Sequence, residues 1–144
     1  MEKQELFDLM NNNVGFHLAT VDGDKPRVRG MMLYKADADG IVFHTGTFKD
    51  LYKQVVANPN AELCFFDSER NIQVRVSGVL DMVDDNGLKD EISNHPSRVF
   101  LQPWKNSVTP EDFYDSFIVF RMRNGRAVVW TMETNLAPKQ VIEL

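Results

Sequence analysis

The sequence lacks the residues that usually crosslink a chain or fix it in a membrane. It has one cysteine among 144 residues, Cys64, so no disulfide can form within the chain. No apolar run approaches the roughly 20 residues of a membrane-spanning helix, and the charged opening Met1-Glu2-Lys3-Gln4-Glu5 is unlike a secretory signal. We therefore expect one domain over residues 1–144, in the reducing environment of the cytoplasm.

Positive charge and metal ligands are also scarce. The 16 Lys and Arg residues face 21 Asp and Glu, which gives a formal net charge of −5. Nucleic-acid binders usually carry a basic surplus, because phosphate contacts supply most of their affinity. The histidines His17, His44 and His95 are far apart, and one cysteine cannot build a zinc site. We expect neither nucleic-acid nor metal binding, although a local basic pocket for one small phosphate is compatible with this composition.

The common motifs of nucleophilic and nucleotide-binding enzymes are missing as well. The sequence has no Gly-x-Ser-x-Gly elbow, no Walker-type loop and no Gly-x-Gly-x-x-Gly motif. Cys64 follows Leu63 and precedes Phe65 and Phe66, which predicts a buried, inert thiol. No catalytic side chain is therefore assigned.

What the sequence does contain is a series of alternating apolar segments between turn signals. Helical spacing of apolar residues predicts helices over residues 2–12, 48–57 and 84–94, and Thr109-Pro110 is typical of a further helix start. Period-two alternation between turns predicts strands over residues 16–21, 27–35, 41–45, 61–67 and 72–83, with a final hairpin of residues 117–123 and 127–132 around Asn124-Gly125. The tail 133–144 shows no clear pattern.

Six or seven antiparallel strands with a few short helices form either a barrel or a sandwich. Gly78 lies in the middle of the strand predicted over residues 72–83, where a glycine marks a bulge or a tight bend. This glycine favours the barrel. The fold class is therefore mainly β with short helices.

The segment from His44 to Lys49 is the first candidate binding site. A strand ends, Thr45 and Thr47 flank Gly46, and a helix begins. The free N–H groups and dipole of a helix start attract an anion, and the threonine hydroxyls and Lys49 would add donors and charge. The alternative is an ordinary strand-to-helix turn, in which Thr47 caps the helix and Lys49 is solvated.

Two other segments carry candidate contacts. Arg27 and Arg29 lie on one face of a strand, and Gly30 leaves the sheet surface beside them open to a flat ring. The amide of Gln73, on the polar face of a later strand, suits a pyrimidine-like edge. The alternatives are solvated arginines on an edge strand, core methionines at Met31 and Met32, and an outward-facing glutamine.

Taken together, the segments resemble the pyridoxamine 5′-phosphate oxidase-like superfamily of FMN-binding split barrels. The resemblance rests on four stretches in order: 16–27 as the opening hairpin, 29–35 as the strand lining the flavin, 43–49 as the phosphate-binding segment, and 73–78 as the strand whose glutamine meets the ring. It implies a Greek-key split β-barrel. It also implies a homodimer with two FMN sites at the subunit interface.

The resemblance also implies roles for individual residues. The stretch from Arg29 through Gly30 and Met31 to Met32 would contact the flavin. His44 and Thr45, with Thr47 in the same segment, would lie beside the ribityl chain and phosphate. Lys49 would pair with the phosphate, and Gln73 would reach the isoalloxazine edge.

The chain departs from the oxidase proper at two places. Its phosphate loop is shorter and less basic, and no arginine follows Arg126, where the oxidase has an arginine-rich substrate segment. It is more similar to the small general-stress and nitroimidazole-reductase-like (Nim) members. The leading hypothesis is an FMN-dependent oxidoreductase that passes electrons to a small acceptor: a quinone, a nitro compound or a pyridoxamine-phosphate-like substrate. The alternatives are a non-enzymatic FMN-binding or storage protein, and a haem-binding split barrel with His44 or His95 on the iron.

Overall fold

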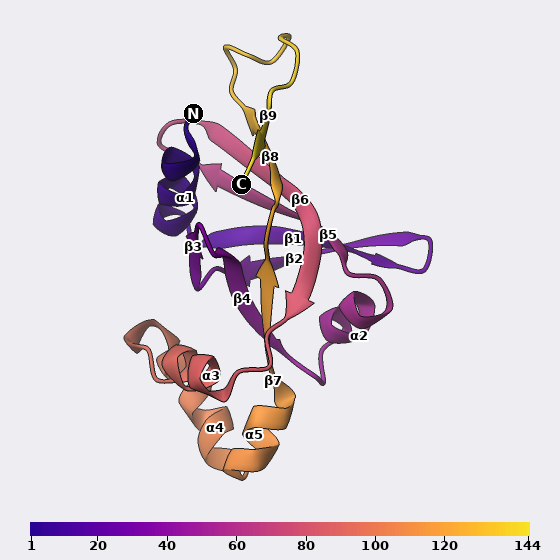
Figure 1. The fold of residues 1–144 in the computed structure, drawn as a ribbon, viewed down its shortest axis with the longest axis vertical. Coiled ribbons are helices and arrows are strands. Elements are labelled where there is room, and N and C mark those ends of the chain that lie inside the picture. The colour runs from indigo at the N-terminus through magenta and orange to yellow at the C-terminus, as the bar shows by residue number, and fades with distance from the viewer.

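The computed structural model describes residues 1–144 and is built around one sheet of nine strands (Figure 1). The strands are β1 (Gly15–Asp22), β2 (Lys25–Met32), β3 (Lys35–Asp37), β4 (Gly40–Gly46), β5 (Asn60–Asp67), β6 (Ile72–Met82), β7 (Phe117–Met122), β8 (Arg126–Trp130) and β9 (Val141–Glu143). All strand pairs are antiparallel. The mainly β, antiparallel prediction is thus confirmed. The expected six or seven strands are too few, because the three-residue strands β3 and β9 carry no readable alternation.

Short helices fill the connections between strands. They are α1 (Lys3–Asn12), α2 (Asp50–Ala57), α3 (Asn86–Ser93), the 3-10 helix Pro96–Leu101, α4 (Gln102–Ser107) and α5 (Pro110–Ser116). α1, α2 and α3 lie where the sequence predicts them, to within two residues at each end. No helix combines the length and the apolar character that crossing a bilayer demands.

Strand β6 holds the sheet together by changing partners along its length. Residues 72–79 pair with β5 on one side and residues 73–77 with β8 on the other, whereas residues 80–82 pair with β7. Gly78 lies between the part that pairs with β8 and the part that pairs with β7. A Cβ there would come within 2.9 Å of the Met122 sulfur, so the glycine marks a close approach at the bend, as the sequence predicts.

The predicted hairpin around Asn124-Gly125 is wrong. β7 pairs with β4 and β6, β8 pairs with β6 and β9, and the two strands do not pair with each other. Asn124 has a φ of 54°, so the segment does turn sharply. The turn carries the chain from one part of the sheet to another, because β7 and β8 each pair with β6 and not with each other.

The strand predicted over residues 27–35 is also divided in the structure. β2 ends at Met32; the Leu33 N–H then bonds to the Val14 carbonyl and the Tyr34 N–H to the Val42 carbonyl. β3 starts at Lys35 and pairs only with β4. The terminal strands β2 and β3 each pair on one side only, so the sheet stays open between them.

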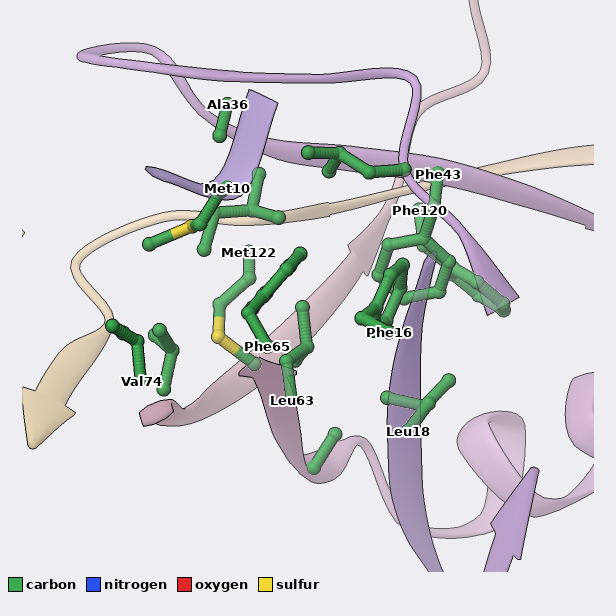
Figure 2. Packing of buried hydrophobic residues seen from close by; sticks show 14 of the residues in the cluster. Met10, Phe16, Leu18, Ala36, Phe43, Leu63, Phe65, Val74, Phe120 and Met122 are labelled. Carbon is green, nitrogen blue, oxygen red and sulfur yellow. The ribbon is translucent and has the colours of Figure 1, made fainter. Parts of the chain in front are cut away.

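The main core fills the concave side of this sheet under α1. Twenty-one buried residues form it, including Met10 of α1, Phe16 and Leu18 of β1, and Phe65 of β5 (Figure 2). The rings of Phe16 and Phe65 stack with centroids 4.8 Å apart. The amphipathic pattern of α1 therefore serves to close one end of the barrel.

A second, smaller core lies on the other face of β4 and β7. Alternation along β7 sends Phe120 and Met122 into the main core and Phe117 and Val119 into the second one. There they pack with Phe113 of α5, in the helical cluster α3–α5 at one end of the molecule (Figure 1). This packing fixes the helical cluster beside the end of β4, where the predicted site begins.

Replacing Gly78 by alanine tests the bend in β6. The added methyl group would overlap the buried Met122 side chain, so we expect the free energy of unfolding in urea to fall by about 1–3 kcal/mol. Gly15→Ala is the matched control, since a Cβ at Gly15 has no neighbour within 4 Å. Equal stability of the two variants would contradict the close approach.

Candidate functional site

The largest cleft in the structure lies between β2, the end of β4, the start of α2 and the helical cluster. Its volume is about 1030 Å³. Six of the predicted residues line it: Arg29, Gly30, Met31, His44, Thr45 and Lys49. The structure thus brings together two segments that are separated by twelve residues in the sequence. The cleft is large enough for a ligand of cofactor size.

One wall of the cleft is the edge strand β2, which leaves an open backbone surface at Gly30. A Cβ at Gly30 would meet nothing within 4 Å. Arg29 and Met31 point the other way from Gly30 along the strand, and Met31 packs against the main core. The strand therefore presents a flat, side-chain-free patch at Gly30 beside an anchored arginine.

The opposite wall is the uncapped start of α2. The Lys49 N–H bonds to the Gly46 carbonyl and the Thr47 N–H to the Ser116 carbonyl, which makes a tight turn after β4. Lys49 is the N-cap residue and no side chain caps the helix. The predicted alternative, a cap by Thr47, is therefore absent. The first N–H groups of α2 are left free at the cleft, where Asp50 and Leu51 lie.

Arg29 is held in place by a small polar network beneath the cleft. Its guanidinium donates to Thr20 Oγ1 at 2.7 Å, to Gln54 Oε1 at 2.6 Å and to the Leu18 carbonyl at 3.2 Å. Burial lowers the pKa of Arg29, and the nearby Asp50 opposes that shift. Because an arginine stays protonated even so, the network fixes one positive charge between β2 and α2.

The cleft is locally basic in an acidic chain. Four cationic side chains line it, together with two carboxylates: Arg27, Arg29, Lys49 and Lys53 against Asp22 and Asp50. Asp22 is paired with Arg27 at 3.1 Å. The remaining positive charge, together with the free N–H groups of α2, makes this end of the cleft suitable for an anion.

His44 lies at the far side of the cleft and is tied to a buried arginine. Arg98, in the 3-10 helix, donates from Nε to His44 Nε2 at 3.0 Å. Burial, and then the charge of Arg98, lower the pKa of His44 to about 4. His44 is therefore neutral at physiological pH.

Sequence reasoning misses the residues that the helical cluster contributes. Arg98, Phe100 and Trp104 lie more than fifty residues after β4, in a stretch without regular periodicity. Phe100 and Trp104 line the cleft, and Trp104 packs on Phe113 and Phe117. No local signal marks them, because only the packing of the second core carries them to the site.

Three of the predicted site residues do not line this cleft. Met32 ends β2 and is exposed, and Thr47 belongs to the turn but faces elsewhere. Gln73 lies on β6 opposite Trp130 and lines a separate cleft of about 410 Å³, against β8 and the loop that follows it. Within one chain, Gln73 therefore does not share a site with Arg29.

The other histidine and cysteine side chains considered from the sequence lie outside the cleft. His95 caps the 3-10 helix by accepting from the Ser97 N–H at 3.1 Å. Cys64 is only half-buried, contrary to the prediction, but burial still raises the pKa of its thiol. No three His, Cys, Asp or Glu side chains come together as a metal site.

Comparison with known proteins places this architecture in one family. The sequence profile of the pyridoxamine 5′-phosphate oxidase family matches residues 3–129. A pyridoxine/pyridoxamine 5′-phosphate oxidase of Rhodopseudomonas palustris is 30% identical over 96 residues, which are 66% of this chain and 45% of that protein. The aligned part spans less than half the length of the first curated relatives.

Solved structures show the same fold across nearly the whole chain. A NimC/NimA family protein from Clostridium acetobutylicum has a TM-score of 0.73 at 19% identity, covering 98% of this chain and 92% of its own. An FMN-binding, pyridoxamine 5′-phosphate oxidase-related protein from Nostoc punctiforme has a TM-score of 0.67 at 15% identity, and the match covers 98% of this chain and 95% of that protein. The haem storage protein HutZ from Vibrio cholerae has a TM-score of 0.61 at 17% identity, and the match covers 84% of this chain and 88% of HutZ.

The fold is an antiparallel split barrel, and its largest cleft is locally basic. The chain belongs to the pyridoxamine 5′-phosphate oxidase family.

The neutral state of His44 predicts a pH dependence of stability. Its pKa of about 4 in the folded chain lies below the roughly 6.5 of an unfolded chain, so the unfolded chain binds the extra proton between these values. The free energy of unfolding should fall by up to about 3 kcal/mol as the pH drops from 6.5 to 4.

His44→Asn has no imidazole to titrate and therefore isolates the contribution of His44. Urea unfolding of the wild type and of His44→Asn at several pH values measures the difference between their free energies of unfolding. The wild type should be more stable by the largest amount above pH 6.5, and this advantage should shrink as the pH falls. A difference that does not change with pH would show that His44 titrates normally.

Proposed function

We propose that the chain binds FMN in the cleft between β2 and α2 and acts as a flavin-dependent oxidoreductase on a small electron acceptor. The observation that carries the proposal is the pairing of the open strand surface at Gly30 with the uncapped, basic start of α2. Membership of the pyridoxamine 5′-phosphate oxidase family and the fold shared with an FMN-binding protein support it.

The phosphate would bind at the start of α2. The cleft there is lined by the residues of the first helical turn with their free N–H groups, by Arg29, whose guanidinium is held in place, and by Lys49. A doubly charged phosphate would gain from each of these donors. Thr45, at the end of β4, adds a hydroxyl on the same side of the cleft.

The ring would lie against β2. A flat heterocycle needs a surface without side chains, and the bare backbone at Gly30, one of the residues that line the cleft, supplies one. Phe100 and Trp104 add apolar surface to the cleft, and the Trp104 ring packs edge-on against Phe48, the neighbour of Lys49, with centroids 5.2 Å apart. The cleft therefore combines charged and apolar surface, as a mononucleotide with an aromatic ring requires.

Bound FMN would supply the electron transfer, while the protein supplies position, charge and exclusion of water. We assign no acid or base among the cleft residues. The acceptor classes we propose are a quinone, a nitro compound or a pyridoxamine-phosphate-like molecule.

We further propose that the active form is a homodimer. Several exposed apolar side chains border the cleft or the strands near Gln73, among them Val28, Phe48, Phe66 and Phe100. Exposed apolar side chains of this size often mark a contact with a partner. In a two-fold dimer, the separate cleft at Gln73 would lie against the flavin cleft of the other chain and complete its site.

Lys49→Ala tests the phosphate end of the cleft. Loss of one charge-assisted contact should weaken FMN binding roughly tenfold, measured by flavin fluorescence quenching on titration. Lys25→Ala, at the exposed β1–β2 turn outside the cleft, should bind as the wild type does. Unchanged affinity in Lys49→Ala would remove that lysine from the phosphate site.

Gly30→Val tests the ring surface by the same titration. A side chain at residue 30 would meet no other atom of the chain within 4 Å of its Cβ, and valine is favoured in strands. The protein should therefore remain folded. The valine side chain would fill the place proposed for the ring, and FMN affinity should drop at least about tenfold. A folded variant with normal affinity would place the ring elsewhere.

Sedimentation of the flavin-loaded protein tests the dimer. We expect a particle of twice the 16.5 kDa chain mass. Phe66→Glu places a charge on the exposed strand beside Gln73, outside the flavin cleft of its own chain. It should give monomers that have lost flavin. Monomeric wild type with bound flavin would contradict a shared site.

Two alternative functions, haem binding and non-enzymatic FMN binding or storage, can be distinguished from this proposal by an absorption spectrum and by an activity assay. The fold shared with HutZ supports a haem-binding protein, although His44 offers only one ring nitrogen to iron because Arg98 occupies the other. A Soret band in the purified protein would favour haem over flavin. Flavin without turnover of reduced nicotinamide and a nitro or quinone acceptor would favour an FMN-binding or storage protein.

A further inference from the structure

Arg98 is a buried arginine without a carboxylate partner. Its side chain is 2% exposed, and its three donor groups bond to His44 Nε2 at 3.0 Å, Ser97 Oγ at 3.0 Å and the Leu33 carbonyl at 2.7 Å. Its guanidinium also lies over the Tyr34 ring, 5.5 Å from the centroid. The buried positive charge of Arg98 is therefore balanced by neutral acceptors alone, although burying a charge is costly. One of these acceptors, His44, lines the cleft.

The bond from Arg98 settles which nitrogen of His44 carries the proton. A guanidinium can only donate and does not lose its proton in a protein. His44 Nε2 must therefore accept, with a free lone pair. In the neutral ring the hydrogen is then on Nδ1, whereas an imidazole in water exchanges between both tautomers.

The Nδ1 hydrogen is free to meet a ligand. His44 Nδ1 has no hydrogen-bond partner in the chain. Among buried side-chain nitrogen and oxygen atoms, only the Nε of Arg121 lacks a partner. His44 Nδ1 is therefore accessible rather than buried, and the His44 side chain lines the cleft. The rings of Phe117 and Phe100 flank the imidazole, with centroids 5.1 and 6.3 Å away, so no carboxylate competes for this donor.

We propose that Arg98 is a positioning residue that holds His44 in the Nδ1–H tautomer, so that His44 presents a fixed donor to an oxygen acceptor of the bound ligand. The ligand part of this inference rests on the proposed function. It makes His44 selective: a hydroxyl, carbonyl, phosphate or nitro oxygen is accepted at this place, whereas an ammonium, which can only donate, would meet a second donor. Such a mismatch would leave the Nδ1–H donor unpaired beneath the bound ligand.

Nitrogen NMR of the histidine side chains tests the tautomer in the intact protein. The spectrum of the ¹⁵N-labelled wild type should show His44 with a protonated Nδ1 and an unprotonated Nε2 from pH 8 to pH 5.5. Its assignment comes from the signal lost in His44→Asn, since the chain has only three histidines. A protonated Nε2 in the wild type would overturn the inference without any variant of Arg98.

Two variants separate positioning from packing. Arg98→Lys keeps a group that can only donate. A hydrogen bond from its Nζ to His44 Nε2 should preserve the Nδ1–H tautomer. Arg98→Leu removes the donor, and the Nε2–H form should then appear in a folded protein. An unchanged tautomer in folded Arg98→Leu would show that Arg98 does not set it.

FMN titration tests the donor itself. The side-chain amide of asparagine places an N–H near the position of Nδ1, so His44→Asn should bind within about threefold of the wild type, and His44→Leu roughly tenfold more weakly. Equal affinities of these two variants would overturn the ligand contact while leaving the tautomer result intact. Wild type that binds no flavin at all would instead refute the proposed function.

Discussion

Strand β6 changes partners at Gly78, and the architecture depends on that change. Before the bend the strand lies between β5 and β8, and after it the strand pairs with β7. The bend needs a residue without a side chain, because the buried Met122 sulfur lies 2.9 Å from the place of a Cβ. Since β7 carries β4 alongside it, the orientation of the whole β3-β4-β7 part follows from this one contact.

The position of the cleft is a consequence of the same geometry. β4 ends at Gly46 and the chain runs into α2, while β2 forms one open edge of the sheet. β2 and β4 do not pair, so the cleft lies between the free N–H groups at the start of α2 and the bare backbone of β2. A chain with net charge −5 thus gathers four cationic side chains where an anion would bind.

The second core adds chemistry as well as stability. Phe113 and Phe117 fix the helical cluster against β4 and β7, and the cluster in turn delivers Arg98 to His44. Burial and the charge of Arg98 lower the pKa of His44 to about 4. His44 is thus a neutral ring with a defined acceptor and a defined donor, although nothing in its own strand determines either.

Most of the local structure could be predicted from the sequence. Apolar alternation and turn residues placed most strands and three of the helices, and Gly30, Gly78 and Lys49 were recognisable because each breaks or ends a regular pattern. Which of these elements meet could not be predicted in this way. The Asn124-Gly125 turn, Gln73 and Arg98 show why: strand pairing and helix docking depend on shape complementarity between distant segments, and no local pattern encodes it.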